Sequence, residues 1–303
     1  MSTNTEFDIP PNATKLALLI CDTPVPAVLE RDGTYHDVYH TWLRITHPKN
    51  DIPSESTFIL EGFDVKEQIY PNLDSNDYSG ILISGSAASA YEDKPWINKL
   101  VSWVGETAKT HPDIKLIGIC FGHQIISRAM GGTCVRNNGK WELGTTDIDL
   151  SPIGQIVLNT DRKSIPIQQV HADHVPFVPP TFHSIGSSPT TPVQGLVRFY
   201  PSTTTTTTSS SSSSSSSSDP DPDPSSETTP APSNPSDPST IQILTIQGHP
   251  EFTKDIVSSI IDAREGILGP DVVADGRARA GREHEGLGVL GRAVWRVLLA
   301  RRV

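Results

Sequence analysis

The sequence predicts an α/β fold with a mostly parallel central sheet, helices on both faces of the sheet and a small antiparallel flap. Short continuous apolar runs, such as residues 16–21 and 114–120, are typical of strands that are buried on both faces. Amphipathic stretches follow such runs, so strands and helices alternate along the chain. Between residues 134 and 200 the pattern changes to short strand-like pieces separated by glycine and proline, and these predict the flap.

The N-terminal part supplies most of the predicted parallel strands. Strands are predicted at residues 16–21, 58–65 and 78–85, where apolar residues cluster. Helices are predicted at 33–43 and 96–108, because apolar side chains recur there every three or four residues. Each of these helices lies between two strands in the chain, as parallel pairing requires.

The middle of the chain contains one further strand–helix unit and the beginning of the flap. A strand at 114–120 is followed by a helix at 124–130, which a pair of glycines ends. Residues 145–150 and 155–158 are predicted as strands of the flap.

The C-terminal part returns to the strand–helix pattern. Residues 241–246 predict a strand, 253–262 a helix and 289–301 a terminal helix. One face of the terminal helix carries six apolar residues, namely Val289, Leu290, Ala293, Val294, Val297 and Leu298. We expect this face to pack on the core; a helix that binds a membrane or calmodulin is the weaker interpretation.

A low-complexity tract interrupts this pattern. Residues 202–239 are nearly all Ser, Thr, Pro and Asp. Such a composition cannot bury enough apolar surface to offset the entropy lost on ordering, so we expect a disordered surface insert. We further expect a flexible N-terminus at residues 1–14 and a single domain at 15–303 that contains the insert.

Charge and cysteine content exclude several classes of function. The net charge of −11 argues against a broad nucleic-acid surface. Three scattered cysteines are too few for a disulfide framework or a zinc site. The N-terminus lacks a basic region followed by a long apolar run, so neither a signal peptide nor a membrane span is predicted. We expect a protein of the cytoplasm or the nucleus that needs no metal or other cofactor.

The sharpest motif is Gly118-Ile-Cys120-Phe-Gly122, which lies between a predicted buried strand and a helix. Small residues on both sides permit the tight strand-to-helix turn called a nucleophile elbow. The helix N-terminus then favours a thiolate on Cys120, and the N–H of Phe121 points toward an oxyanion on the attacked carbon. A buried structural cysteine is the alternative interpretation of this motif alone.

A second motif can supply the base that a cysteine nucleophile needs. His249-Pro250-Glu251 follows the predicted strand 241–246, so both ionisable side chains lie just past the carboxyl end of a strand. The tight turn allows the imidazole and the carboxylate to pair. A surface turn would show the same three residues, but the elbow in the same chain favours a catalytic pair.

Four segments resemble the class I glutamine amidotransferases, a family with a Cys–His–Glu triad and a flavodoxin-like fold. They begin at Ile83 (ISGS), Gly118 (GICFGHQI), Val170 (VHADHV) and Gln247 (QGHPEF) and follow one another in the family's order. The resemblance covers about residues 15 to 265, apart from the insert. The stretch from Gly85 to Trp96 is most similar to stand-alone members, which include the gamma-glutamyl peptidases and amidotransferase-like proteins of fungal biosynthetic clusters.

The resemblance implies a role for each matching residue. Cys120 corresponds to the nucleophile, His249 to the general acid and base, and Glu251 to the group that orients His249. The implied oxyanion hole and substrate contacts are Gly85, Ser86, Phe121, Gln124, Val170, Ala172 and Asp173. This sequence departs from the family at Gly85-Ser-Ala, where many members have Gly-Gly-Pro, and at Ala172, where glycine is frequent; we expect a reshaped pocket.

Other histidines and cysteines are expected to be structural. Cys21 ends a buried strand and Cys134 lies in the flap, so neither is expected to react. His123 is expected to pack or to form a hydrogen bond. The resemblance puts His171 and His174 near the site, but their spacing does not favour a metal.

The segment Trp141-Glu142 lies in the predicted flap. It could form a wall of the site, and an ordinary flap turn is an equally good interpretation.

The resemblance implies cleavage of a γ-glutamyl amide through a thioester on the cysteine. Ammonia as leaving group would make the protein a glutaminase that serves a separate synthase subunit, since the sequence contains no ATP-binding motif. An amino acid or conjugate as leaving group would make it a stand-alone gamma-glutamyl peptidase. A role in secondary metabolism is implied only by the resemblance, and a non-catalytic binding module on the same fold is the third possibility.

Overall fold

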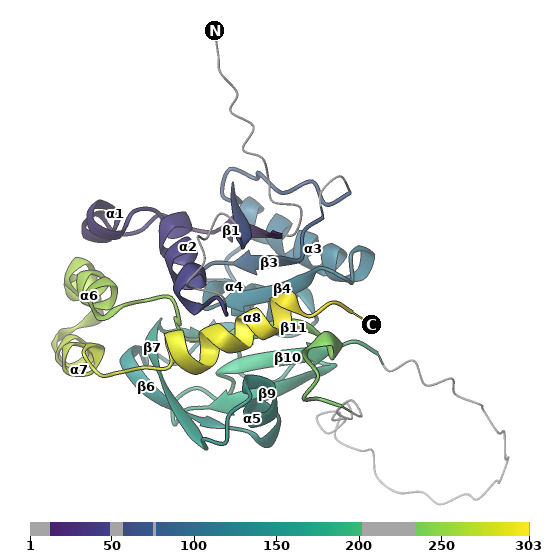
Figure 1. Cartoon of the computed structure of the whole chain (residues 1–303). Coiled ribbons are helices and arrows are strands. Elements are labelled where there is room, and N and C mark those ends of the chain that lie inside the picture. Colours follow the sequence, from purple (N-terminus) through teal and green to yellow (C-terminus); the bar gives the residue numbers. More distant parts are fainter. Residues whose placement is uncertain (1–12, 49–56, 75–76, 202–233, 303) are drawn as a thin grey trace, which may run out of the picture.

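A nine-stranded sheet forms the centre of the computed structural model, which describes residues 13–48, 57–74, 77–201 and 234–302 (Figure 1). Its strand order is β2-β1-β3-β4-β11-β10-β9-β6-β7. The strands are β1 (Thr14–Ile20), β2 (Phe58–Asp64), β3 (Gly80–Ile83), β4 (Lys115–Ile119), β6 (Glu142–Leu150), β7 (Ser164–His171), β9 (Phe182–Ser187), β10 (Gly195–Phe199) and β11 (Ile241–Ile246).

The parallel half of the sheet contains β2, β1, β3, β4 and β11. The strands β3, β4 and β11 are buried along their whole length, which explains their largely apolar sequences. Every strand predicted in the N-terminal part, and the strands predicted at 114–120 and 241–246, are present. The predicted α/β fold class is therefore confirmed.

The antiparallel strands continue the same sheet. β10 pairs with β11, β9 with β10, and β6 joins β9 to β7, each in antiparallel orientation. A separate two-stranded sheet is formed by β5 (Val135–Arg136) and β8 (Asp173–His174). The antiparallel region predicted after residue 134 therefore forms half of the central sheet and, in addition, one short pair.

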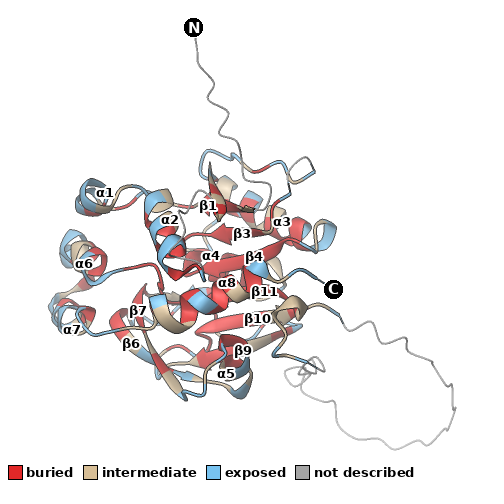
Figure 2. Ribbon diagram, viewed as in Figure 1, coloured by how far each residue is buried: buried red, intermediate tan, exposed pale blue. Residues whose placement is uncertain are grey.

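Helices cover both faces of the sheet. One apolar cluster joins α2 and α8 to the sheet, and a second joins α3 and α4 to the opposite face. In Figure 1, α8 (yellow) crosses the sheet in front of β4 and β11, and Figure 2 shows that the strands between the helix layers are buried. The helices are α1 (Pro26–Asp32), α2 (Tyr35–Thr46), α3 (Pro95–Thr110), α4 (Phe121–Ala129), α5 (Pro152–Leu158), α6 (Lys254–Leu268), α7 (Pro270–Ala280) and α8 (Gly291–Leu299).

The strand predicted at 155–158 is wrong, because these residues form the end of α5. The Ser151 hydroxyl accepts a hydrogen bond from the Gly154 N–H at 3.0 Å, and Pro152 occupies the first turn. Asn159 then ends the helix in the left-handed conformation. A short apolar run does not distinguish a strand from a buried helix, and the capping residues were the missed signal.

The terminal helix packs on the core, as predicted. A π-helical turn (Gly286–Leu290) leads into α8, and all of the predicted apolar face except the half-buried Val289 is buried. Trp295 is also buried, and its indole N–H donates to the Leu43 carbonyl at 2.9 Å. This contact joins the end of the chain to α2.

The predicted insert and N-terminus lie mainly outside the described residues. The structure does not describe residues 1–12 and 202–233. Thr14 already belongs to β1, and residues 234–240 lead through a turn and a short 3-10 helix (Pro238–Thr240) into β11. Within the described residues, no helix combines the length and the apolar character that crossing a bilayer needs.

Candidate active site

The candidate site lies where three neighbouring parallel strands end. Cys120 follows β4, Gly85 follows β3 after one residue, and His249 follows β11 after two. Because β3, β4 and β11 are parallel neighbours, their carboxyl ends meet at one edge of the sheet. The fold thereby brings together segments that are far apart in the sequence.

Cys120 occupies a strained strand-to-helix turn. Its φ of 52° and ψ of −103° place it in a region that side-chain-bearing residues rarely adopt, and α4 begins at the next residue. The turn is possible because Gly118 and Gly122 pack closely: a Cβ at Gly118 would lie 2.7 Å from the Gly122 carbonyl carbon. The Cys120 N–H donates to the Ile246 carbonyl at 2.8 Å and ties the turn to β11.

His249 is held between a carboxylate and an aromatic ring. Its Nδ1 lies 2.8 Å from Glu251 Oε1, and both side chains are buried. The ring stacks on Phe252 with 4.0 Å between centroids and an interplanar angle of 4°. On its edge, a Cβ at Gly85 would lie 2.8 Å from His249 Cε1, so glycine is needed there.

The charges around His249 favour its protonated form. Burial alone would lower the pKa of His249, but Glu251 and Cys120 raise it to about 10. Both groups also form side-chain hydrogen bonds with the ring that raise its pKa. The imidazolium therefore lies between a carboxylate and the sulfur atom of Cys120.

A cavity of about 240 Å³ opens beside Cys120. Six predicted site residues line it: Ser86, Cys120, Gln124, Val170, Ala172 and Asp173. The four others (Gly85, Phe121, His249 and Glu251) are outside the lining. Gly85 and Phe121 are chain neighbours of lining residues, His249 forms a hydrogen bond with Cys120, and Glu251 contacts His249. Phe121 is buried against Trp96, with ring centroids 5.5 Å apart. As the first residue of α4, Phe121 has a backbone N–H without an acceptor in the helix.

Two glutamines link the floor of the cavity to the cysteine. Gln124 Nε2 donates to the Asp173 carbonyl at 3.0 Å and to Gln247 Oε1 at 3.2 Å. Gln247 Nε2 in turn lies 3.7 Å from Cys120 Sγ. Gln247 is not among the predicted site residues, although it begins the segment QGHPEF and stands two residues before His249.

Glu142 forms a buried polar network behind the cavity wall. Its Oε1 accepts hydrogen bonds from the hydroxyls of Ser188 and Thr190, and its Oε2 accepts one from Gln194 Nε2 at 2.7 Å. His171 Nε2 lies 3.0 Å from the same Oε2. Burial would raise the pKa of Glu142, but His171 and the hydroxyl donors lower it to about 2.

The structure distinguishes between the two interpretations of Trp141-Glu142, a wall of the site or an ordinary flap turn. Trp141 lines the cavity, so this part of the segment is a wall of the site. Glu142 is buried outside the cavity lining and is paired with His171 in the register of β6 and β7. His171 Nδ1 also contacts the Asp173 carbonyl at 3.0 Å, so the network reaches the backbone of the lining strand.

Replacing Glu142 with glutamine is expected to lower the free energy of unfolding by about 2 kcal/mol. The amide group brings donors to a place where hydroxyl, amide and imidazole donors already converge, and it removes the charge that they solvate. Urea unfolding measures the change. Asp262→Asn, which breaks an exposed ion pair, is the control and is expected to have almost no effect. Equal stabilities of the two variants would contradict the network.

Cys21, Cys134 and His123 lie outside the lining of this cavity. Cys21 and Cys134 are buried, and burial raises the pKa of each thiol, to about 12 for Cys21. His123 is fully buried, which lowers its pKa to about 3, and its Nδ1 contacts Thr245 Oγ1 at 2.7 Å. Within the described ranges, no group of three or more metal-binding side chains is present.

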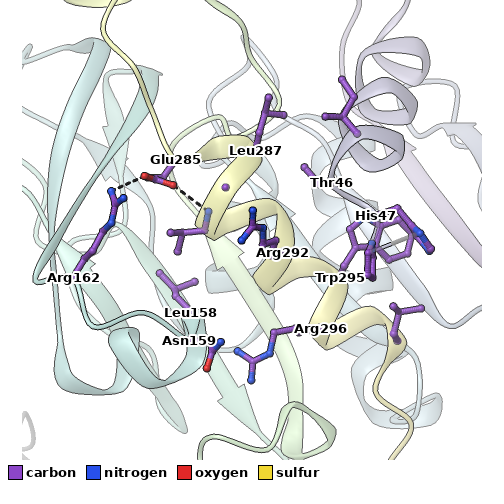
Figure 3. A pocket seen from close by; sticks show the side chains of 15 residues that line it. Thr46, His47, Leu158, Asn159, Arg162, Glu285, Leu287, Arg292, Trp295 and Arg296 are labelled. Atoms are coloured by element: carbon purple, nitrogen blue, oxygen red, sulfur yellow. Dashed lines mark hydrogen bonds and ion pairs between the residues drawn. The ribbon is translucent and has the colours of Figure 1, made fainter. Parts of the chain in front are cut away.

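A larger cavity lies away from this site. It has a volume of about 920 Å³ and lies where the ends of α2 and α5 meet the terminal helix (Figure 3). Its lining includes Leu158, Trp295 and Arg292, and an ion pair between Arg162 and Glu285 crosses one side. No cysteine lines it, so the smaller cavity beside Cys120 is the candidate active site.

Comparisons with known proteins agree with this fold and show the family. Residues 36–198, more than half of the chain, match the family model described as Glutamine amidotransferase class-I. The chain therefore belongs to the class I glutamine amidotransferase family. A solved glutamine amidotransferase of Thermotoga maritima has the same fold, with a TM-score of 0.61 and 16% identity over 95% of this chain and 98% of that chain.

Two curated relatives differ in how much of the chain they match. A glutamine amidotransferase-like protein of Schizosaccharomyces pombe is 28% identical over 83% of this chain and 84% of the relative. Gamma-glutamyl peptidase 4 of Arabidopsis thaliana is 33% identical, but over only 40% of this chain and 45% of the relative. The first match therefore extends over nearly the whole fold, whereas the second covers less than half of each protein.

Proposed function

We propose that the protein hydrolyses γ-glutamyl amides, with Cys120 as nucleophile, His249 as general acid and base, and Glu251 as the residue that orients His249. One observation carries the proposal: a cysteine with strained backbone angles begins a helix beside a buried imidazole that is itself bound to a carboxylate at 2.8 Å. Membership of the class I glutamine amidotransferase family supports the reaction class.

In the first step the Cys120 thiolate attacks the γ-carbonyl carbon and forms a carbon–sulfur bond. The electron pair of the carbonyl moves to its oxygen, and the N–H of Phe121 with the backbone at Gly85 and Ser86 stabilises this oxyanion. The helix dipole of α4 acts in the same direction, because its N-terminus begins at Phe121.

In the second step protonated His249 donates its proton to the departing nitrogen, and the carbon–nitrogen bond breaks. A γ-glutamyl thioester remains on Cys120. His249, now neutral, removes a proton from water, which attacks the thioester and releases glutamate. Glu251 keeps the ring oriented and compensates its positive charge.

The glutamyl end of the substrate is assigned to the floor of the cavity. Asp173 supplies a carboxylate for the α-amino group, and Gln124, Val170 and Ala172 line the same part of the cavity. If ammonia leaves, a separate synthase subunit would receive it, whereas a peptidase needs no such partner. One relative is named a glutamine amidotransferase-like protein and another a gamma-glutamyl peptidase.

Glutamate release from glutamine, glutathione and a glutathione S-conjugate tests the proposal. We expect release from at least one of the three substrates, at a rate proportional to protein concentration. Ammonia as the second product would identify a glutaminase, and a cysteinylglycine product would identify a peptidase. No release from any substrate would refute the hydrolase and favour a binding module on the same fold.

Replacing Glu251 with glutamine is expected to change the pH profile of kcat/KM. Thioester formation requires protonated His249, so activity of the unaltered protein falls as the pH rises through about 10. The variant lacks the carboxylate that raises the pKa of His249, so its falling limb should begin at a pH at least about one unit lower. Glu251→Asp, which keeps the charge, is the control. If the activity of Glu251→Gln fell at the same pH as that of the unaltered protein, Glu251 would not have the role proposed for it.

A further inference from the structure

We propose that Arg264 binds a carboxylate on the leaving group, so that the preferred substrate is a γ-glutamyl amino acid or peptide with a free C-terminal carboxylate. The inference rests on the proposed function and names its substrate class. Four features of the described residues carry it: an unpaired arginine in the cavity lining, its place in the same lining as Cys120, a second arginine in that lining beside Asp173, and the charge of the whole lining.

Arg264 lies on α6, is half-buried and lines the cavity beside Cys120. Within the described part of the chain it forms no ion pair or hydrogen bond, although 35 acidic residues are present in the sequence. The acidic side chains next to it on α6 point elsewhere: Asp262 and Glu265 both pair with Arg277 of α7. The guanidinium of Arg264 is therefore available to a ligand of the cavity.

The position of Arg264 places it near the leaving group. Tyr35 stacks on Phe252 at 6.3 Å, and Phe252 stacks on His249. Burial, Asp22 and Glu251 raise the pKa of Tyr35, and the positive charge of Arg264 opposes them. The phenol of Tyr35 is thus within electrostatic reach of both Glu251 and Arg264. Because Arg264 also lines the cavity that contains Cys120, we assign it to the leaving-group end of that cavity.

A different arginine lies at the glutamyl end. Arg136 lines the same cavity, and in the short β5–β8 sheet it is directly opposite Asp173. The carbonyl of Asp173 is bound by Gln124, which approaches from α4. Arg136 is therefore placed for the α-carboxylate of the glutamyl group, next to the carboxylate assigned to its amino group. Arg264 is not needed for that purpose.

The charges of the lining match a γ-glutamyl peptide better than glutamine. Apart from Cys120 and from His171, which pairs with Glu142, the charged lining residues are Arg136, Arg264 and Asp173. A γ-glutamyl amino acid carries two carboxylates and one ammonium group, which complement two arginines and one aspartate. Glutamine carries one of each and would leave Arg264 without a partner.

The test compares two substrates that differ only in the charge of the leaving group, γ-glutamylalanine and γ-glutamylalaninamide. For each substrate, kcat/KM is measured from glutamate release by the full-length protein and by Arg264→Gln. The variant should lose roughly 10- to 100-fold in kcat/KM on γ-glutamylalanine, mainly through KM, and should change little on the amide. Arg264→Lys, which keeps the charge but not the planar fork, should recover part of the loss.

Arg136→Gln is the matched control, because it removes the same charge from the glutamyl end of the same cavity. It should lower kcat/KM equally on both substrates. Equal losses on both substrates for Arg264→Gln, or no loss, would overturn the inference while the hydrolase remains supported by Cys120-dependent release. Absence of release from both substrates and from glutamine, glutathione and the glutathione S-conjugate would overturn the proposed function itself. Circular dichroism of each variant shows whether it is folded.

Discussion

Replacing Cys120 with serine is expected to lower the rate of glutamate release by at least about a thousandfold. A serine hydroxyl fits the space of the thiol but is a much weaker nucleophile at neutral pH, so the variant lacks the proposed nucleophile beside His249. The elbow and the His249–Glu251 pair do not depend on the sulfur atom. The measurement is glutamate release under saturating substrate, with thermal unfolding of both proteins alongside.

Cys134→Ser provides the control for this experiment. Cys134 is also buried, and burial raises the pKa of its thiol, but it does not line the cavity. Its replacement should leave glutamate release within about twofold of the unaltered rate. If Cys120→Ser retained a tenth of the activity or more, Cys120 would not be the nucleophile, and the elbow would have a structural role.

Replacing Gly122 with alanine is expected to lower the free energy of unfolding by about 3 kcal/mol. A methyl group there would overlap the carbonyl oxygen of Ile83 and lie 2.9 Å from its Cβ. Ile83 cannot move away freely, because it is paired with Gly118 in the parallel register of β3 and β4. Because the same strands hold Cys120, we also expect slower glutamate release from the variant that remains folded.

Gly266→Ala is the matched control, since it places the same methyl group in another helix. No atom lies within 4 Å of the added Cβ in α6. Helix interiors favour alanine over glycine, so the free energy of unfolding of this variant should rise by up to about 1 kcal/mol. Urea unfolding of both variants measures the contrast. A loss for Gly122→Ala no larger than the change at Gly266 would show that the tight packing at the elbow contributes little to stability.

Local patterns predicted most of the fold because the central parallel strands β3, β4 and β11 are buried along their whole length and are therefore largely apolar. The apolar pattern did not predict segments that are short or largely exposed. Residues 155–158 belong to a seven-residue helix that capping residues define. α1 is equally short and buries only Val28, and α7 lacks a strong apolar stripe. The order of the antiparallel strands depends on long-range pairing, which no local pattern contains.

Those residues of the candidate site could be predicted whose reactive side chains stand within a short turn motif. Cys120 and the pair His249 and Glu251 are such residues, and the structure brings them together. Glu142 and Arg264 depend instead on register and on helix placement. Glu142 meets His171 only because β6 pairs with β7, and Arg264 lines the cavity only because α6 lies beside it. Neither residue belongs to a sequence motif from which its role could be predicted.

Covalent labelling tests the central claim most directly, namely that Cys120 attacks the carbonyl group of a bound γ-glutamyl substrate. The reagent is a chloromethyl ketone analogue of glutamine, whose electrophilic carbon lies next to the position of the scissile carbonyl. Peptide mass spectrometry should find one label per chain, on Cys120, and glutamate or a γ-glutamyl peptide should slow its attachment. A label on Cys21 or Cys134, or an unlabelled Cys120 in protein that still releases glutamate, would contradict the account.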